Sequence, residues 1–171
     1  MMDFLSRLEN LQFSMWVLQS GSIWAYPTIL TLHTIGMMMV AGLIGVIDLR
    51  LLGIAPTIPI RPLERLYPII WSAFTINAIT GTILLIADAT TKLTNPDFYV
   101  KMVFIAFGLV VLVRMRKRVF GDPQLDVAPV NGSAKGLAWL SLAAWVGAIT
   151  AGRLLAYLGP VSGGIKGLTN K

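Results

Sequence analysis

The sequence contains no cysteine and carries little charge. Asp, Glu, Lys and Arg together account for 13% of its 171 residues. Without cysteine the chain cannot form a disulfide framework, a thiolate zinc site, an iron–sulfur cluster or a cysteine nucleophile. Soluble domains carry about 25% charged residues, whereas 56% of this chain is hydrophobic. We therefore expect most of its surface to contact lipid rather than water.

The signatures of several common activities are also missing. The chain has no glycine-rich phosphate loop, no HExxH motif, no EF-hand loop and no Ser/His/Asp set on suitable elements. Its net charge of +6 is not accompanied by a basic stripe interleaved with exposed aromatic residues. These absences argue against hydrolases, NTPases and nucleic-acid partners, and the positive charge suits anionic lipid.

Hydrophobic runs predict four membrane spans, over residues 23–53, 66–89, 97–115 and 137–158. Before them, apolar residues recur at helical spacing over residues 3–18, which is typical of an amphipathic helix in the membrane interface. The sequence thus predicts an all-α integral membrane protein, a four-transmembrane-helix bundle preceded by an amphipathic interfacial N-terminal helix. We expect the interfacial helix over residues 1–20, the transmembrane domain over 21–159 and a flexible C-terminal tail over 160–171.

The distribution of Lys and Arg predicts the orientation in the membrane. With four spans, one side carries the loops between spans 1 and 2 and between spans 3 and 4. That side holds Arg50, Arg61, Arg65, Arg114, Arg116, Lys117, Arg118 and Lys135, and the other holds Arg7, Lys92, Lys101, Arg153, Lys166 and Lys171. The positive-inside rule places the richer side in the cytoplasm, so both termini are expected outside it.

Ionisable residues within spans are costly and therefore mark candidate sites. His33 lies about ten residues into the first span, hence about 15 Å from its outer end and near the midplane. A neutral imidazole is a common metal ligand, and it suits a haem iron. A histidine that only bonds two helices together, or relays a proton, is the alternative interpretation. His33 is the metal ligand that we expect.

Several residues form the expected surroundings of His33. Asn77, Gly81 and Asp88 share one face of the second span, which we expect to look into the bundle. Gly36, one turn from His33, either admits a neighbouring helix backbone or leaves room for a flat ligand. Met37 shares a face with His33, which leaves a copper site conceivable, although core filling is the stronger interpretation.

Three further polar residues are expected at the outer level of the bundle, namely Lys101, Arg153 and Tyr157. Snorkelling to lipid headgroups would explain the two cations. Because Arg153 lies about one turn inside its span, a buried anion would also compensate it, either Asp88 or a haem propionate. At the opposite end we expect Asp48 to pair with Arg50 or with headgroups rather than to form a site.

A family resemblance rests on residues distributed over most of the chain. They are Leu32-His33-Thr34-Ile35-Gly36, Gly42, Asp48 to Gly53, Gly81 to Ala89, Asn95 to Phe98, Lys101-Met102, Ser141, Trp145 and Gly152 to Tyr157. With these the chain resembles an uncharacterised family of small bacterial four-span membrane proteins. It is distantly similar to the membrane domain of copper-resistance D proteins and to the membrane-bound, haem-containing protoporphyrinogen oxidase.

In the oxidase family a histidine of the first helix and a lysine of the third are functional, and His33 and Lys101 match them. The chain departs from that family in having a single histidine, which excludes bis-histidine ligation within one chain. The resemblance implies a protein of the bacterial inner membrane.

Together these features predict a haem b-binding membrane protein that transfers electrons or oxidises a small molecule at the outer side of the membrane. Its cofactor site would comprise His33, Gly36, Met37, Asn77, Gly81, Asp88, Lys101, Arg153 and Tyr157. If the protein is an enzyme, it would be a membrane haem oxidoreductase. The alternatives are a non-catalytic subunit of a membrane complex and a copper-handling protein. We expect the lipid bilayer, further copies or subunits, and an unidentified redox partner as its partners.

Overall fold

All regular structure that a computed structural model describes, over residues 2–127 and 129–157, is helical. Two short helices, α1 (Met2–Glu9) and α2 (Gln12–Gln19), precede α3 (Tyr26–Leu51). The 3-10 turn η1 (Arg61–Arg65) leads into α4 (Leu66–Ala87), and α5 (Ala89–Leu93) follows it. The chain then forms α6 (Pro96–Met115), the π-helical turn η2 (Arg116–Phe120) and α7 (Gly132–Tyr157). The expected tail over 160–171 lies outside the described residues.

Four helices are long and apolar enough to cross a membrane, as the sequence predicted. They are Tyr26–Leu51, Arg61–Ala87, Pro96–Phe120 and Gly132–Leu155. A 26-residue helix such as α3 measures about 39 Å, which exceeds a hydrocarbon core of about 30 Å. Large apolar side chains point outward along these helices, among them Met38, Val103 and Val146, each 60–67% exposed. Such a surface is consistent with a multi-pass membrane protein.

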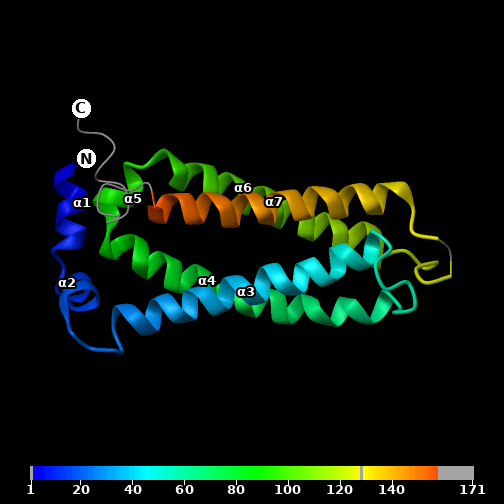
Figure 1. The fold of residues 1–171 in the computed structure, drawn as a ribbon, viewed down its shortest axis with the longest axis horizontal. Coiled ribbons are helices and arrows are strands. Elements are labelled where there is room, and N and C mark those ends of the chain that lie inside the picture. Colours follow the sequence, from blue (N-terminus) through cyan, green and yellow to red (C-terminus); the bar gives the residue numbers. More distant parts are fainter. Residues whose placement is uncertain (1, 128, 158–171) are drawn as a thin grey trace.

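The long helices form two antiparallel pairs, α3 with α4 and α6 with α7 (Figure 1). The pairs meet mainly through α3 and α7, whereas α4 and α6 make no extended contact in the described part of the chain. At one end, which we call the loop end, lie the loops that follow α3 and η2. At the other, the α1–α2 end, the short helices α1, α2 and α5 lie across the bundle.

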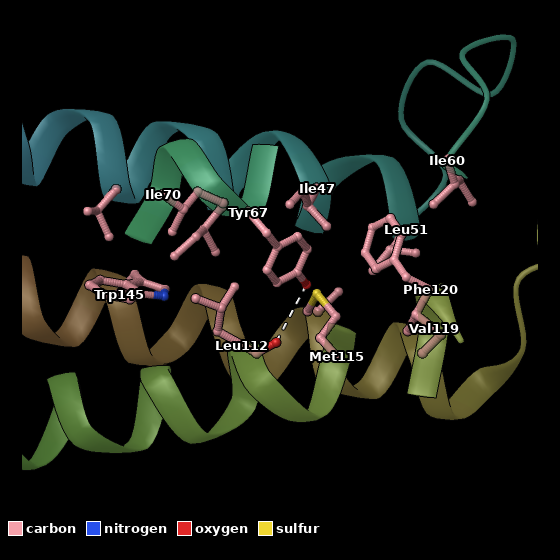
Figure 2. Close-up of a cluster of buried hydrophobic side chains, with 14 of the residues drawn as sticks. Ile47, Leu51, Ile60, Tyr67, Ile70, Leu112, Met115, Val119, Phe120 and Trp145 are labelled. Atoms are coloured by element: carbon pink, nitrogen blue, oxygen red, sulfur yellow. Dashed lines mark hydrogen bonds between the residues drawn. The ribbon is translucent and has the colours of Figure 1, made fainter. Parts of the chain in front are cut away.

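The tightly packed core lies toward the loop end. Figure 2 shows side chains of all four long helices meeting there, with Tyr67 of α4 at the centre. The ring of Tyr67 packs edge-on against Phe120, and its hydroxyl donates a 3.5 Å hydrogen bond to the carbonyl of Leu112. Ile47, Leu51 and Met115 are completely buried around it. The apolar core therefore fixes the loop end and leaves the α1–α2 end more open.

Asp48 is part of this core, which corrects an expectation from the sequence. Its side chain is 0% exposed and lies beside the hydroxyl of Ser141, which is equally buried. It forms no ion pair with Arg50, whose guanidinium donates instead to the carbonyls of Pro56 and Ile58. The position of Asp48 near the end of α3 suggested a surface charge, but α7 covers it there.

A polar latch joins the two loops of the loop end. The carboxylate of Asp126 accepts hydrogen bonds from the backbone N–H groups of Ile60 and Arg61, the latter at 2.8 Å. In return, the guanidinium of Arg61 donates to the carbonyl of Asp122 at 2.9 Å. The loop after α3 is thus held to the loop after η2 by contacts between residues more than 60 positions apart.

The expected single interfacial helix is divided into α1 and α2. The side chain of Asn10 donates to the carbonyl of Ser6, and the hydroxyl of Ser14 donates to the carbonyl of Leu8. Such side-chain bonds compete with the helical backbone pattern, and Leu11 adopts an extended conformation between the two helices. Periodicity alone did not reveal this break because the apolar positions on either side keep the same spacing.

Candidate functional site

His33 lies on α3 and turns its ring toward α4. Its Nδ1 is 3.0 Å from the carbonyl oxygen of Asn77 and 3.2 Å from the hydroxyl of Thr80. The carbonyl can only accept, so Nδ1 carries the proton of the neutral ring. The Thr80 hydroxyl donates to the carbonyl of Ile76 at 2.8 Å and accepts from Nδ1 through a lone pair. Nε2 of the neutral imidazole is therefore left with a free lone pair.

The backbones of α3 and α4 approach closely behind this ring. A Cβ atom added to Gly36 would lie 3.1 Å from Cβ of Asn77 and 3.2 Å from the carbonyl oxygen of Ala73. The amide of Asn77 also donates a 2.6 Å hydrogen bond to the carbonyl of His33. Of the two interpretations of Gly36, the structure supports the close approach of a helix backbone.

The imidazole rests directly on Gly81 of α4. A Cβ atom at that position would stand 2.9 Å from Cε1 and 3.3 Å from Nδ1 of His33. Both residues line an open cavity of about 390 Å³, which we call the His33 cavity. It extends from His33 to the α1–α2 end and is lined by Leu18, Tyr26, Leu30, His33, Gly81, Leu84, Leu85, Asp88, Lys92, Phe98, Lys101, Gly152 and Leu155.

Two lysines bring positive charge to this cavity. Lys92 of α5 forms a 3.0 Å ion pair with Asp88, so one of them is compensated. Lys101 of α6 is half-buried and lies against Gly152 of α7, whose added Cβ would be 3.7 Å from the lysine Nζ. Among the described residues Lys101 has neither an ion pair nor a hydrogen bond. The cavity thus places an uncompensated ammonium group on the same walls as a free imidazole nitrogen.

The structure brings together many of the residues that the sequence singled out. His33, Gly81, Asp88 and Lys101 line the His33 cavity. Asn77 holds the ring of His33 from behind, and Gly36 allows that contact.

Other expected members of the site lie elsewhere. Met37 does not line the His33 cavity but lines a neighbouring cavity of about 20 Å³, whose lining also includes Asn77, Lys101 and Trp145. Arg153 is exposed and forms no ion pair with Asp88, whose partner is Lys92. Tyr157 ends α7, and its side chain lies outside the described residues. The expected depth of His33 also changes, because α3 begins at Tyr26 and places His33 about 10 Å from its start.

Thr80 and Lys92 belong to the site but were missed in the sequence. Lys92 follows Asp88 by four residues, which is the spacing of a helical ion pair. Thr80 follows Asn77 by three residues and therefore lies on the same face of α4. Both spacings can be recognised in the sequence. Arg153 was expected to be the cationic partner of Asp88, and Lys92 was therefore not assigned to the site.

The donor set limits the metals that the site could hold. No group of three or more His, Asp or Glu side chains placed to hold a metal ion occurs in the described part of the chain. His33 could therefore hold a metal only as a single protein ligand, a pattern suited to a cofactor that supplies its remaining ligands itself, as a porphyrin does.

No protein-family model, no curated protein and no solved structure matches this chain.

Proposed function

We propose that the protein binds haem b, with Nε2 of His33 as the axial ligand of the iron. The observation that carries the proposal is the Nδ1 hydrogen bond to the carbonyl of Asn77. Histidine ligands commonly donate the other ring N–H to a carbonyl, which fixes the tautomer and raises the basicity of the coordinating nitrogen. The His33 cavity of about 390 Å³ lies within the usual range of about 300–1,000 Å³ for cofactor sites.

The charges of the cavity suit the acidic groups of haem. Lys101 has no anionic partner among the described residues, and a propionate would compensate its charge. Lys92 lies on the same cavity and would exchange part of its contact with Asp88 for the second propionate. Arg153 does not line the cavity, so Lys92 takes the role that the sequence suggested for Arg153.

Each residue of the site has a defined task in this proposal. Asn77 and Thr80 orient the imidazole, and Gly81 provides the flat surface on which it rests. When bound, haem supplies one-electron chemistry whose potential depends on the axial ligand and on burial. We propose electron transfer or oxidation of a small molecule at the α1–α2 end, which faces the outside if the loop end is cytoplasmic.

Absorption spectra of the detergent-purified protein, expressed with haem available, test the proposal. We expect a reducible Soret band with about one haem per chain, lost in His33→Ala because the only histidine is removed. Met37→Leu is the matched control and should keep the band, since Met37 does not line the His33 cavity. Folded wild-type protein without a Soret band, or an unchanged band in His33→Ala, would refute haem ligation by His33.

A structural role is the second candidate, and a specific observation favours it. The Asn77 amide bonds the carbonyl of His33, and the Gly36 contact locks α3 to α4 at the same level. On this alternative His33 only secures the helix pair within a larger membrane complex. The protein would then be colourless, and His33→Gln would fold normally.

A further inference from the structure

A second hollow lies between α4 and α6, the two long helices that make no extended contact in the described part of the chain. We call it the lateral crevice. It measures about 180 Å³ and is lined by Phe74, Ala78, Thr82 and Leu85 of α4, by Phe98, Met102 and Ile105 of α6, and by His33, Asn77, Gly81 and Lys101. Apart from Thr82, His33, Asn77 and Lys101, the lining is apolar.

The mouth of the crevice offers no free hydrogen-bonding group. Ala78, Thr82 and Met102 are its exposed residues. The hydroxyl of Thr82 donates to the carbonyl of Ala78 at 2.8 Å and is therefore satisfied within α4. Both helices are among the four that are apolar enough to span a membrane. The mouth thus suits contact with lipid chains rather than with water.

The lateral crevice and the His33 cavity meet at a common wall. Five residues line both of them: His33, Gly81, Leu85, Phe98 and Lys101. An apolar ligand lying between α4 and α6 therefore reaches the imidazole of His33 and the ammonium group of Lys101. Because Lys101 has no anionic partner among the described residues, an acidic group on that ligand would be strongly favoured there.

Helices α1 and α2 lie across the other approach to the site. Leu18 of α2 lines the His33 cavity, and α1 is held to α5 by a hydrogen bond from the backbone N–H of Thr90 to the carboxylate of Glu9. The route from water therefore runs beside the covering helices. The route from the bilayer passes between α4 and α6, which make no extended contact and are joined toward the loop end by the hydrogen bond from Tyr67 to Leu112.

We propose that the ligand of this site is a bilayer-dissolved amphiphile with an acidic group, which reaches His33 laterally between α4 and α6. Its apolar part lies in the lateral crevice, and its acidic group pairs with Lys101. This inference deepens the proposed function, since haem, an apolar ring with two carboxylates, belongs to the same class. The ligand class itself does not depend on haem and is tested without it.

The probe is a long-chain fatty acid with a photoreactive diazirine in its chain, added to haem-free protein in lipid nanodiscs. Labelling mapped by mass spectrometry should concentrate at positions 78–85 of α4 and 98–105 of α6. Lys101→Met removes the charge and keeps the side chain at nearly constant length. In this variant we expect the labelling of the two segments to fall about tenfold. Labelling spread evenly over the outward faces of all four helices, or unaffected by Lys101→Met, would overturn the proposal.

Blocking the mouth tests the lateral route. Ala78→Phe narrows the mouth of the crevice from the side of α4, and Met102→Trp narrows it from the side of α6. If one of these variants does not fold, the other still tests the route. Ile79→Phe is the matched control, because Ile79 is 57% exposed and lines neither hollow. We expect each blocking variant to reduce crevice labelling about tenfold and the control to leave it unchanged. Equal labelling in a folded blocking variant and the wild type would refute the lateral route.

The haem measurement separates this inference from the proposed function. If fatty-acid labelling follows the pattern above but no Soret band forms, haem binding fails and the amphiphile site stands. If haem binds but both blocking variants take it up from liposomes as fast as the wild type, the proposed function stands and the lateral route is wrong.

Discussion

The carbonyl of Asn77 decides which nitrogen of His33 carries the proton. In the sequence, His33 and Asn77 stood out as polar residues within apolar spans, and membrane energetics alone made them candidates. Their pairing was not predictable, because it depends on how α3 and α4 are rotated about their axes. The same rotation places Met37 away from the His33 cavity, although it lies one turn from His33 on α3.

Gly81→Ala should disturb the site without removing any functional group. The added Cβ would stand 2.9 Å from Cε1 of His33, so the ring must move away from its partners on α4. Such overpacking costs about 1–3 kcal/mol, and we expect haem affinity to fall about tenfold or more. Gly42→Ala is the control, since nothing lies within 4 Å of a Cβ there. Titration of both variants with haem measures their affinities. Equal haem affinities of Gly81→Ala and Gly42→Ala would contradict the expectation.

Asp48 gives a second prediction at this scale. Its carboxyl group is 0% exposed and has no cationic partner in the described part of the chain. Burying a charged carboxylate is expensive, so the site should accept a neutral group of the same shape. We expect Asp48→Asn to unfold at the same temperature as the wild type or higher, and Asp48→Lys to be strongly destabilised. Thermal unfolding in detergent tests both expectations. A much lower unfolding temperature of Asp48→Asn would show that the carboxyl group is needed for stability.

The ends of the helices depart most from the sequence-based expectations. The predicted third span ended at Met115, but the chain continues as η2 because Val119 and Phe120 cover the core at the loop end. The fourth span was expected from residue 137, yet α7 begins at Gly132. There the side chain of Asn131 accepts from the N–H of Ala134 and caps the helix. Glycine and polar residues suggested a loop in this stretch.

The latch between the two loops gives a pH-dependent prediction. Slight burial acts to raise the pKa of Asp126, but the hydrogen bonds from Ile60 and Arg61 and the charges of Arg50 and Arg61 outweigh it. They hold this pKa below its ordinary value of 3.8. Because the pKa is lowered, the latch stabilises the fold fully at pH values above the ordinary pKa of an aspartate. This contribution is lost as the pH falls through the folded-state pKa.

Thermal unfolding of Asp126→Asn tests the latch. At about pH 7 the variant should melt below the wild type, because a neutral amide is a weaker acceptor for the two N–H groups. Toward about pH 3 the difference should shrink as the wild-type carboxylate takes up a proton. A difference that stays constant with pH would show that the charge of Asp126 does not stabilise the loops.

At the scale of the whole molecule, the sequence predicts a cytoplasmic loop end. The chain has no cysteine, so single cysteines can be introduced at Gln124, in the loop after η2, and at Ser22, between α2 and α3. These two positions report on the loop end and on the α1–α2 end of the bundle. In intact cells a membrane-impermeant maleimide should label Ser22→Cys and leave Gln124→Cys unlabelled until the membrane is opened. The reverse pattern would invert the topology and place the His33 cavity toward the cytoplasm.

The sequence by itself determined the class of this protein, since the transfer of long apolar segments into lipid depends on composition and length alone. It also determined which polar residues are costly in a membrane, His33, Asn77, Asp88 and Lys101 among them. Only the tertiary structure decided which of these meet. Helix rotation and pairing buried Asp48, turned Arg153 outward and left α4 apart from α6. Those outcomes depend on packing between segments far apart in the chain, which local sequence patterns do not encode.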